Sequence, residues 1–220
     1  MGGFLINPKH VCLYQITFYP IFWGFHITDW NDSWIFFSQK HTVKYLKQYE
    51  PIGCRDPYTA KRLSDMGIKT HVTYCLTLTF PKREQQPLNG KIIVVDLPHN
   101  LLPQYIHKQA AYYSHSLPGN GYRESLKRIL ARELLNIYHK QARLVITSRL
   151  HCLLPCIAME IPVIFFGNPD DYRISWVTEL GVNIFTKNDL DKIDWNPVPI
   201  SFEKRKMDMI NQFNSHMRSI

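Results

Sequence analysis

The chain has 220 residues, of which 45% are hydrophobic and 20% charged, so it is long enough to bury a core without disulfides or a metal. The net charge of +8 is spread along the chain. Residues 1–90 contain 10 basic and 6 acidic residues, and residues 91–220 contain 16 basic and 12 acidic residues. No nucleic-acid-binding motif accompanies this charge, which leaves an anionic small substrate or an anionic membrane surface. The five cysteines include no C-x-x-C pair and indicate neither a disulfide framework nor a zinc ribbon.

The beginning of the chain lacks the basic region and apolar run of a secretory signal, and no apolar stretch is long enough to span a bilayer. We therefore expect a cytoplasmic protein, and leave peripheral contact with the inner membrane surface open. Residues 11–27 are apolar and aromatic, and predict strand or short buried segments around a turn at Pro20 and Gly24. Residues 38–49 predict a helix that Ser38 can cap.

Residues 51–54 resemble a short strand. Asp56 is a good N-cap and Pro57 a good first residue, so a helix is expected to begin there and to end before Gly67. Residues 71–80 are β-branched and aromatic and predict a second strand.

The polar segment 81–90, with two prolines and a glycine, is the best linker candidate. We place a domain boundary there, between an N-terminal α/β lobe over 1–84 and a C-terminal Rossmann-like lobe over 91–220. The second lobe is predicted to contain a strand over 91–96, a helix over 122–140 with an apolar stripe from Leu126 to Tyr138, a strand over 143–147, a loop and helix over 148–160, a strand over 162–166, a helix over 172–180 and a charged C-terminal helix over 201–218. This alternation predicts an α/β fold whose parallel sheet carries helices on both faces.

A candidate anion site follows the strand over 143–147, at Ser148, Arg149, Leu150 and His151. Open α/β sheets bind ligands where strands end and helices begin. A helix N-terminus favours phosphate or carboxylate, and an arginine fork such as Arg149 can bind an anion through two hydrogen bonds. His151 can donate to phosphate or move a proton near neutral pH. The alternative is a plain helix cap whose arginine faces solvent.

Three further side chains have a functional and a structural interpretation. Arg55 also follows a strand and precedes a helix cap, and is either an anion contact or an exposed arginine paired with Asp56. Arg173 follows the strand over 162–166 and is either an anion contact or a solvated helix start. His26 stands in apolar company, which is more often the setting of a core histidine.

Together these segments resemble the polysaccharide pyruvyl transferase family. The resemblance spans roughly residues 20 to 182, and it is carried, in family order, by Tyr49–Asp56 with Thr59, Cys75–Thr79, Ala142–His151, and Ile161–Ile164 with Asp171–Arg173. One departure is that Thr73 and Tyr74 stand where family members often have Ser-Gly. Another is that the first residues already resemble the middle of the family's first lobe, so we expect the opening strand and helix units of longer members to be missing.

The resemblance implies two Rossmann-like lobes as in GT-B glycosyltransferases, here with a reduced N-terminal lobe. It implies transfer of pyruvate from phosphoenolpyruvate to two hydroxyls of a saccharide, forming a cyclic ketal, without a metal or cofactor. By motif match, the catalytic residues are His151, Arg149 and His26, and the substrate-binding residues are Arg55, Ser148, Leu150, Arg173, Cys75 and Thr77.

Two other functions stay open. A sugar-nucleotide glycosyltransferase on a similar scaffold would need an acid that binds the ribose, for which Asp170 and Asp171 are the candidates. A non-catalytic sugar- or membrane-binding remnant would keep the fold without the site. A lipid-linked acceptor and a homo-oligomer are also left open.

Overall fold

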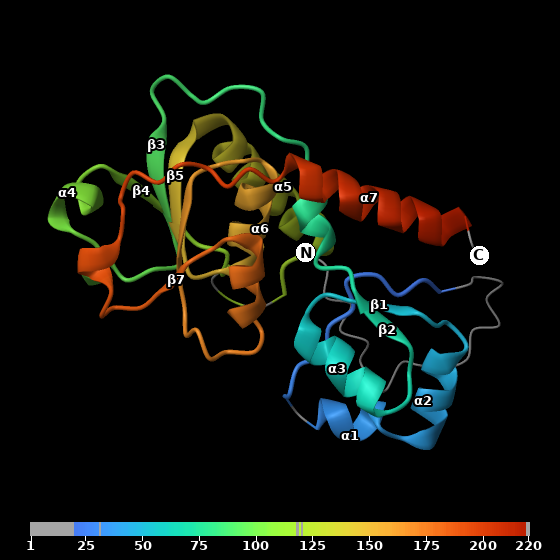
Figure 1. Ribbon diagram of the computed structural model, residues 1–220. Coiled ribbons are helices and arrows are strands. Elements are labelled where there is room, and N and C mark those ends of the chain that lie inside the picture. The colour runs from blue at the N-terminus through green and yellow to red at the C-terminus, as the bar shows by residue number, and fades with distance from the viewer. Residues whose placement is uncertain (1–19, 31, 118, 120, 219–220) are drawn as a thin grey trace. The chain divides into compact units, whose positions relative to one another are not determined.

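The computed structural model describes residues 20–30, 32–117, 119 and 121–218. The chain divides into two compact units, Met1–Leu76 and Thr77–Ile220 (Figure 1). The linker-like segment 81–90 belongs to the second unit, where Arg83 is buried and donates a hydrogen bond to the carbonyl of Ala142. The part of the predicted segment 11–27 up to residue 19 lies outside the described residues.

The first unit is a small α/β unit built on two parallel strands. Its elements are the helices α1 Ser33–Phe37, α2 Lys40–Lys47 and α3 Pro57–Asp65 and the strands β1 Ile52–Cys54 and β2 Thr70–Val72. β1 and β2 pair in parallel, with α3 as the connection between them. Leu46, Ile52, Leu63 and Ile68 are buried in its core.

Helix α3 is confirmed with the predicted signals. The side chain of Asp56 accepts a hydrogen bond from the backbone N–H of Thr59, Pro57 is the first helical residue, and Gly67 follows the helix with φ +73°. The helix over 38–49 is confirmed as α2, but Ser38 does not cap it. Ser38 instead ends the additional helix α1, where its hydroxyl donates to the carbonyl of Ile35.

The predicted strand over 71–80 is wrong beyond Val72. Tyr74 takes a left-handed backbone conformation with φ +57°, which turns the chain out of the sheet, and Leu76–Thr79 form the 3-10 helix η2. The hydroxyl of Thr73 supports this exit, because it donates to the carbonyl of Cys54 and accepts from the N–H of Gly24. A conformation that glycine adopts without strain is thus held here by side-chain hydrogen bonds.

The second unit contains a five-stranded, all-parallel sheet in the order β4-β3-β5-β6-β7 (Figure 1). The predicted strands are confirmed as β3 Lys91–Val95, β5 Ala142–Thr147 and β6 Val163–Phe166, whereas β4 Ala110–Tyr113 and β7 Ile184–Phe185 were not predicted. The chain adds β4 on one side of β3 and then β5, β6 and β7 on the other. The strand order therefore reverses between β3 and β5, and their carboxyl ends form the topological switch point at which open α/β sheets bind ligands.

Alternate residues of the central strands pack into two cores, one on each face. Ile92 and Val94 face the first core, which Gln104–His107 (α4) and Leu190–Lys192 (the 3-10 helix η5) help to cover. Ile93 and Val95 face the second core, which is covered by α5 Glu124–Gln141 and α6 Leu150–Ala158. Helices on both faces of a parallel sheet make this unit Rossmann-like.

Helix α5 is confirmed, but its apolar stripe is buried only toward its C-terminal end. Tyr138 is buried against the sheet, while Leu126 and Ile129 are 39% and 55% exposed. The predicted helix over 172–180 is the 3-10 helix η4 Ser175–Leu180, ended by Gly181 with φ +83°.

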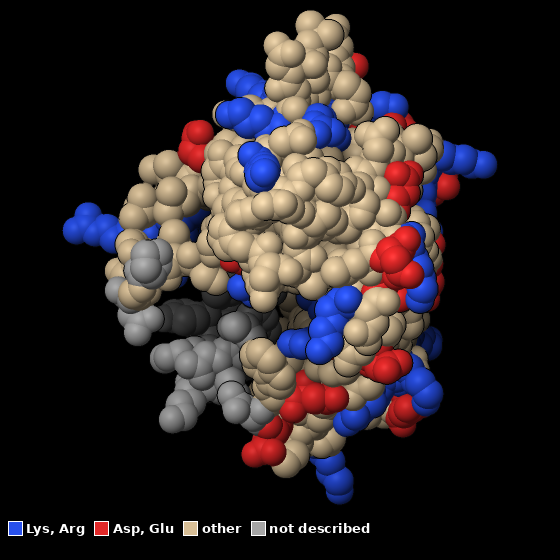
Figure 2. Space-filling view, turned by 90° about the vertical axis from the view of Figure 1, so that its left-hand side faces the viewer, with Lys and Arg blue, Asp and Glu red and all other residues tan. Residues whose placement is uncertain are grey.

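The C-terminal helix is confirmed as α7 Glu203–Arg218. On the side of the second unit that carries α4, Figure 2 shows lysine and arginine interspersed with aspartate and glutamate around a broad uncharged area. This face therefore carries no single basic patch. None of the helices described here combines the length and the hydrophobicity needed to cross a membrane.

Candidate functional site

The carboxyl ends of β3 and β5 bring an acidic and a basic side chain together. Asp96 follows β3 directly, and Ser148 and Arg149 follow β5. Arg149 Nε donates to Asp96 Oδ2 over 2.7 Å, and the Ser148 hydroxyl donates to the backbone carbonyl of Asp96 over 3.0 Å. The turns after the two strands are thus tied to each other at the switch point.

The loop after β4 completes this group. The Ser114 hydroxyl donates to Asp96 Oδ1 over 2.5 Å, and the backbone N–H of His115 donates to Oδ2 over 3.0 Å. Arg149 Nη2 donates to the Ser116 hydroxyl over 3.2 Å. We call Asp96, Ser114, Ser116, Ser148 and Arg149 the switch-point cluster.

Asp96 is built into this position. Its backbone is left-handed with φ +53°, a conformation that aspartate and asparagine tolerate better than most residues. Burial raises the pKa of its carboxyl, but hydrogen bonds from Ser114, from the N–H of His115 and from Arg149, together with the charge of Arg149, outweigh burial and lower the pKa. Asp96 is therefore a carboxylate at neutral pH.

Arg149 is also the N-cap residue of α6. Its backbone is extended, and its N–H donates to the hydroxyl of the buried Thr147, which in turn donates to the carbonyl of Val95. The carbonyl of Arg149 accepts from the N–H groups of Cys152 and Leu153, so α6 begins at Leu150 as predicted. Among the described residues, the N-cap makes no side-chain capping bond, so the positive end of the helix is directed at the same edge of the sheet as the Arg149 side chain.

Leu150 and His151 form the first turn of α6 and are half-buried. Below them, the buried Cys152 contacts His115 and Tyr138, and His115 Nε2 lies 2.8 Å from the Tyr138 hydroxyl. Burial raises the pKa of Cys152, and hydrogen bonds with Cys156, His115 and Tyr138 outweigh it and lower the pKa. Cys152 and Cys156, four residues apart in α6, are both fully buried.

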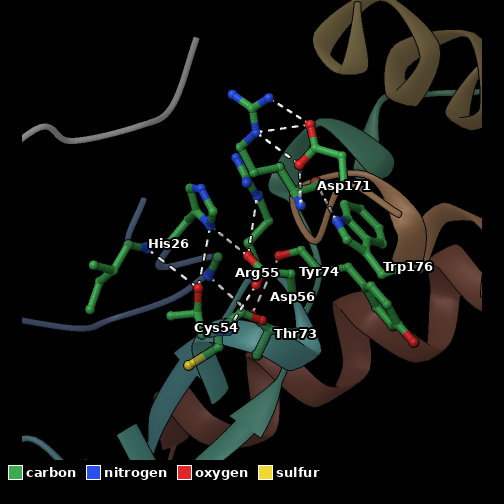
Figure 3. Close-up of polar contacts among 12 residues, drawn as sticks. His26, Cys54, Arg55, Asp56, Thr73, Tyr74, Asp171 and Trp176 are labelled. Atoms are coloured by element: carbon green, nitrogen blue, oxygen red, sulfur yellow. Dashed lines mark hydrogen bonds and ion pairs between the residues drawn. The ribbon is translucent and has the colours of Figure 1, made fainter. Parts of the chain in front are cut away.

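In the first unit, His26, Arg55 and Asp56 form a second polar group (Figure 3). His26 Nδ1 lies 2.7 Å from Asp56 Oδ2, and Arg55 Nε lies 3.6 Å from the same oxygen. Asp56 is fully buried, and its other oxygen accepts from the N–H of Thr59. Burial raises the pKa of Asp56, but the hydrogen bond and charge of His26, the N–H of Thr59 and the charge of Arg55 outweigh burial and lower the pKa.

A backbone ladder beside β1 places His26 there. The N–H of Phe25 donates to the carbonyl of Gly53, and the N–H of Arg55 donates to the carbonyl of Phe25. Gly53 permits this approach, because a Cβ at that position would lie 2.8 Å from the carbonyl oxygen of Phe22 and 2.7 Å from Thr73 Cγ2. His26 is thus the partner of a buried carboxylate. Its apolar neighbours in the sequence gave no sign of this partner.

Arg173 has a carboxylate partner in its own turn. The Nε and Nη2 of Arg173 donate to the two oxygens of Asp171, and the indole N–H of Trp176 donates to the backbone carbonyl of Arg173 (Figure 3). Of the other predicted contacts, Cys75 is buried in the first unit, and Thr77 lies in η2 at the start of the second.

A pocket of about 490 Å³ lies elsewhere in the second unit. Its lining includes Tyr105, Gln109, Arg143 and Trp195 but none of the predicted site residues. Arg143 stands near the amino end of β5, so this pocket is at the opposite edge of the sheet from the switch point.

The structure thus joins Ser148 and Arg149 to Asp96, and His26 and Arg55 to Asp56. The acidic partner Asp96 and the serines of the loop after β4 were not predicted to belong to a site. Asp96 carried a usable signal, because an acidic residue directly after a buried parallel strand stands at the ligand-binding edge of the sheet.

Comparison with known proteins identifies a family. A family model described as polysaccharide pyruvyl transferase matches residues 19–171. This range begins before His26 and ends at Asp171, so it contains the switch-point cluster and the group around Asp56. No curated protein and no solved structure compared with the chain matches it.

Proposed function

The chain belongs to the polysaccharide pyruvyl transferase family, and from this premise we propose that it transfers pyruvate from phosphoenolpyruvate to hydroxyls of a polysaccharide or its precursor, forming a pyruvate ketal. The observation that carries the proposal is the pairing of an oriented arginine with the N-terminus of α6 at the switch point of the sheet. A donor with one phosphate and one carboxylate suits such a site.

The second unit supplies the donor-binding residues in this proposal. Arg149 and the first turn of α6, with Leu150 and His151, bind the phosphate and carboxylate of phosphoenolpyruvate. The Ser148 hydroxyl lies beside them and is held by the carbonyl of Asp96. Arg173 is assigned a lesser role, because Asp171 already occupies its guanidinium.

The first unit contributes Arg55 and His26 by family resemblance, as one of two lobes of a GT-B-like fold. The family resemblance also assigns Cys75 and Thr77 as substrate contacts. The contact with Asp56 gives His26 a defined chemistry, because a carboxylate can only accept, so Nδ1 carries the proton. Proton exchange with a substrate then uses Nε2, the arrangement of a histidine oriented by a buried carboxylate.

The reaction needs an acid, a base and fixed positive charge. Protonation of the methylene carbon of phosphoenolpyruvate makes an oxocarbenium-like centre at C2, and one sugar hydroxyl attacks this centre and loses its proton. A second hydroxyl then displaces phosphate, so the products are the cyclic ketal and inorganic phosphate. We assign His151 as a hydrogen-bond donor to the phosphate and as the general acid, and His26 as the general base.

The acceptor is a saccharide by family. The net charge of +8 and the many aromatic residues suit a polymeric or lipid-linked acceptor held at a membrane surface.

Thermal unfolding with candidate ligands tests the proposal. Phosphoenolpyruvate should raise the Tm of the wild type, whereas UDP- and GDP-sugars should not, because a ligand stabilises the folded state that binds it. Arg149→Ala should abolish the shift. Arg132→Ala, which removes an exposed arginine of α5, should keep it.

The other outcomes are equally informative. A Tm shift with a nucleotide sugar but not with phosphoenolpyruvate would identify a glycosyltransferase instead. A folded protein that responds to neither ligand would identify a remnant without donor binding. If His151→Ala kept near-normal turnover, His151 would have no role as acid.

A further inference from the structure

We propose that Asp96 is a positioning residue of the donor site, which holds the Nε edge of Arg149 so that the outer edge of the guanidinium is presented to the donor anion. This inference rests on the proposed function. It concerns a residue that neither the motif match nor the sequence analysis assigned to the site.

The contacts of Arg149 divide its guanidinium into two edges. Nε is bound by Asp96 over 2.7 Å and Nη2 by Ser116 over 3.2 Å. For Nη1 there is no hydrogen bond to any residue in the described part of the chain. Two fixed points on one side of a planar group determine its orientation, so an anion meets the Nη1 side and the remaining proton of Nη2.

Arg149 needs such an anchor because its side chain is 48% exposed. A free arginine at a strand end samples many rotamers, and binding an anion would then cost the entropy of ordering it. The Asp96 carboxylate is only 11% exposed, so it is a fixed point on which the more mobile arginine is oriented.

Asp96 is itself held from three directions. The Ser114 hydroxyl and the N–H of His115 donate to its carboxylate, and the Ser148 hydroxyl donates to its backbone carbonyl. These donors come from the loops after β4 and β5, so one aspartate joins the ends of three neighbouring strands. An acid that served only to neutralise the charge of Arg149 would not need these three hydrogen bonds.

Positioning and simple electrostatics predict opposite effects of removing Asp96. A carboxylate next to an anion site repels the donor, so its removal should tighten anion binding if charge alone matters. If Asp96 positions Arg149, its removal should weaken donor binding although the site becomes more positive. The sign of the change therefore decides between the two roles.

Titration calorimetry with phosphoenolpyruvate on the full chain provides the first test. We expect Asp96→Asn and Asp96→Ala to raise the Kd between about 10- and 100-fold, the range that a small misplacement of a binding group produces. Asparagine tolerates the left-handed backbone, and its single carbonyl oxygen cannot serve the donors that the carboxylate serves now. Asp189→Asn is the matched control, since Asp189 also pairs with a basic side chain and accepts from Thr186 in the same unit.

The Kd of Asp189→Asn should stay within about twofold of the wild type, because the partners of Asp189, Lys192 and Thr186, lie outside the switch-point cluster. An unchanged or lower Kd in both Asp96 variants would overturn the proposal. If the wild type itself does not bind phosphoenolpyruvate, the proposed function fails, and the second test still decides the role of Asp96.

The second test observes Arg149 without a ligand. In a heteronuclear NMR spectrum, the Nε–H signal of Arg149, assigned by its loss in Arg149→Lys, should be protected from solvent exchange in the wild type and in Asp189→Asn. It should broaden or exchange rapidly in Asp96→Asn, while the backbone amide signals away from the cluster stay in place. An Nε–H signal with wild-type protection in Asp96→Asn would show that Asp96 does not hold the guanidinium.

Discussion

At the residue scale, two of the carboxylates that pair with predicted site cations, Asp56 and Asp96, differ in how they are held. Asp56 is fully buried and serves α3 as N-cap at the same time as it binds His26. Asp96 lies at the surface end of a strand and is held by a loop. The pKa of each is lowered by its donors against the effect of burial, so both are charged at neutral pH.

Replacing Asp56 by asparagine should lower the free energy of unfolding by roughly 1–3 kcal/mol near neutral pH, because helix N-H and histidine donors lose a charged acceptor. The pKa of folded Asp56 is below its unfolded value of about 3.9, so the stabilisation is present above about pH 4 and is lost as the pH falls through the folded pKa. The free energies of unfolding of the wild type and of Asp56→Asn, measured with urea, should therefore become equal at acidic pH.

The control for this prediction is Asp65→Asn in the same helix. Asp65 pairs with Lys61 on the surface, so its loss should change the free energy of unfolding by less than about 0.5 kcal/mol. Equal effects of the two substitutions, or a difference between wild type and Asp56→Asn that persists in acid, would contradict the role given to Asp56.

The sequence analysis predicted a site at Arg149 but not at Asp96, although the same physical rule applies to both. Arg149 was found because a strand of hydrophobic residues leads into a helix with basic and imidazole side chains at its start. Asp96 ends an equally clear strand, but the short pieces α4 and β4 that follow it gave no pattern. Without β4 in the prediction, neither the strand reversal nor the serines of its loop could be placed.

At the scale of elements, the long apolar strands, the short strand β1 and the helices with clear start or stop signals were predicted correctly, whereas β4, β7 and the end of β2 were not. β3 and β5 are buried on both faces, which requires a nearly continuous hydrophobic sequence. β4 at the edge of the sheet is only half-buried, so nothing forces its sequence to be distinctive. Residues 73–80 have strand-forming side chains, yet the left-handed Tyr74 ends the strand, and such a turn leaves no mark in periodicity.

Within the second unit, the buried Glu160 binds the N-terminal end of helix α7. One oxygen of Glu160 accepts from the N–H groups of Phe202 and Glu203 at the start of α7, and the other pairs with Lys82. Burial raises the pKa of Glu160, and the hydrogen bonds and charge of these partners outweigh it and lower the pKa. The carboxylate thus acts as a helix cap supplied by a distant residue.

Glu160→Asn should detach this cap while it preserves the backbone, because asparagine tolerates the φ of +53° but is one methylene too short to reach α7. We expect a loss of about 1–2 kcal/mol in unfolding free energy, as for other N-caps, and faster hydrogen exchange at the first amides of α7. Asp208→Asn, on the exposed face of the same helix, should change neither. Unaltered exchange at Phe202 and Glu203 would show that Glu160 is not the cap.

At the scale of the whole molecule, the chain consists of two units with separate cores. Leu63 is buried among residues of the first unit, and Leu144 is buried against β3 and β6 in the second. From the polar segment 81–90, the sequence analysis predicted a boundary between two lobes. Polarity and prolines mark an irregular segment but do not show which side it packs on, and Arg83 attaches this segment to the second unit.

Separate cores predict separate local stabilities, which a matched pair of substitutions can test. Leu63→Ala and Leu144→Ala remove the same atoms from the two cores and should each cost about 2–5 kcal/mol in the affected unit. By hydrogen exchange, Leu63→Ala should accelerate the amides of β1 and β2 and leave those of β3 and β5 at wild-type rates, and Leu144→Ala should do the reverse. If either substitution accelerated the amides of both units equally, the chain would unfold as one cooperative body, and donor binding in the second unit would depend directly on the core of the first.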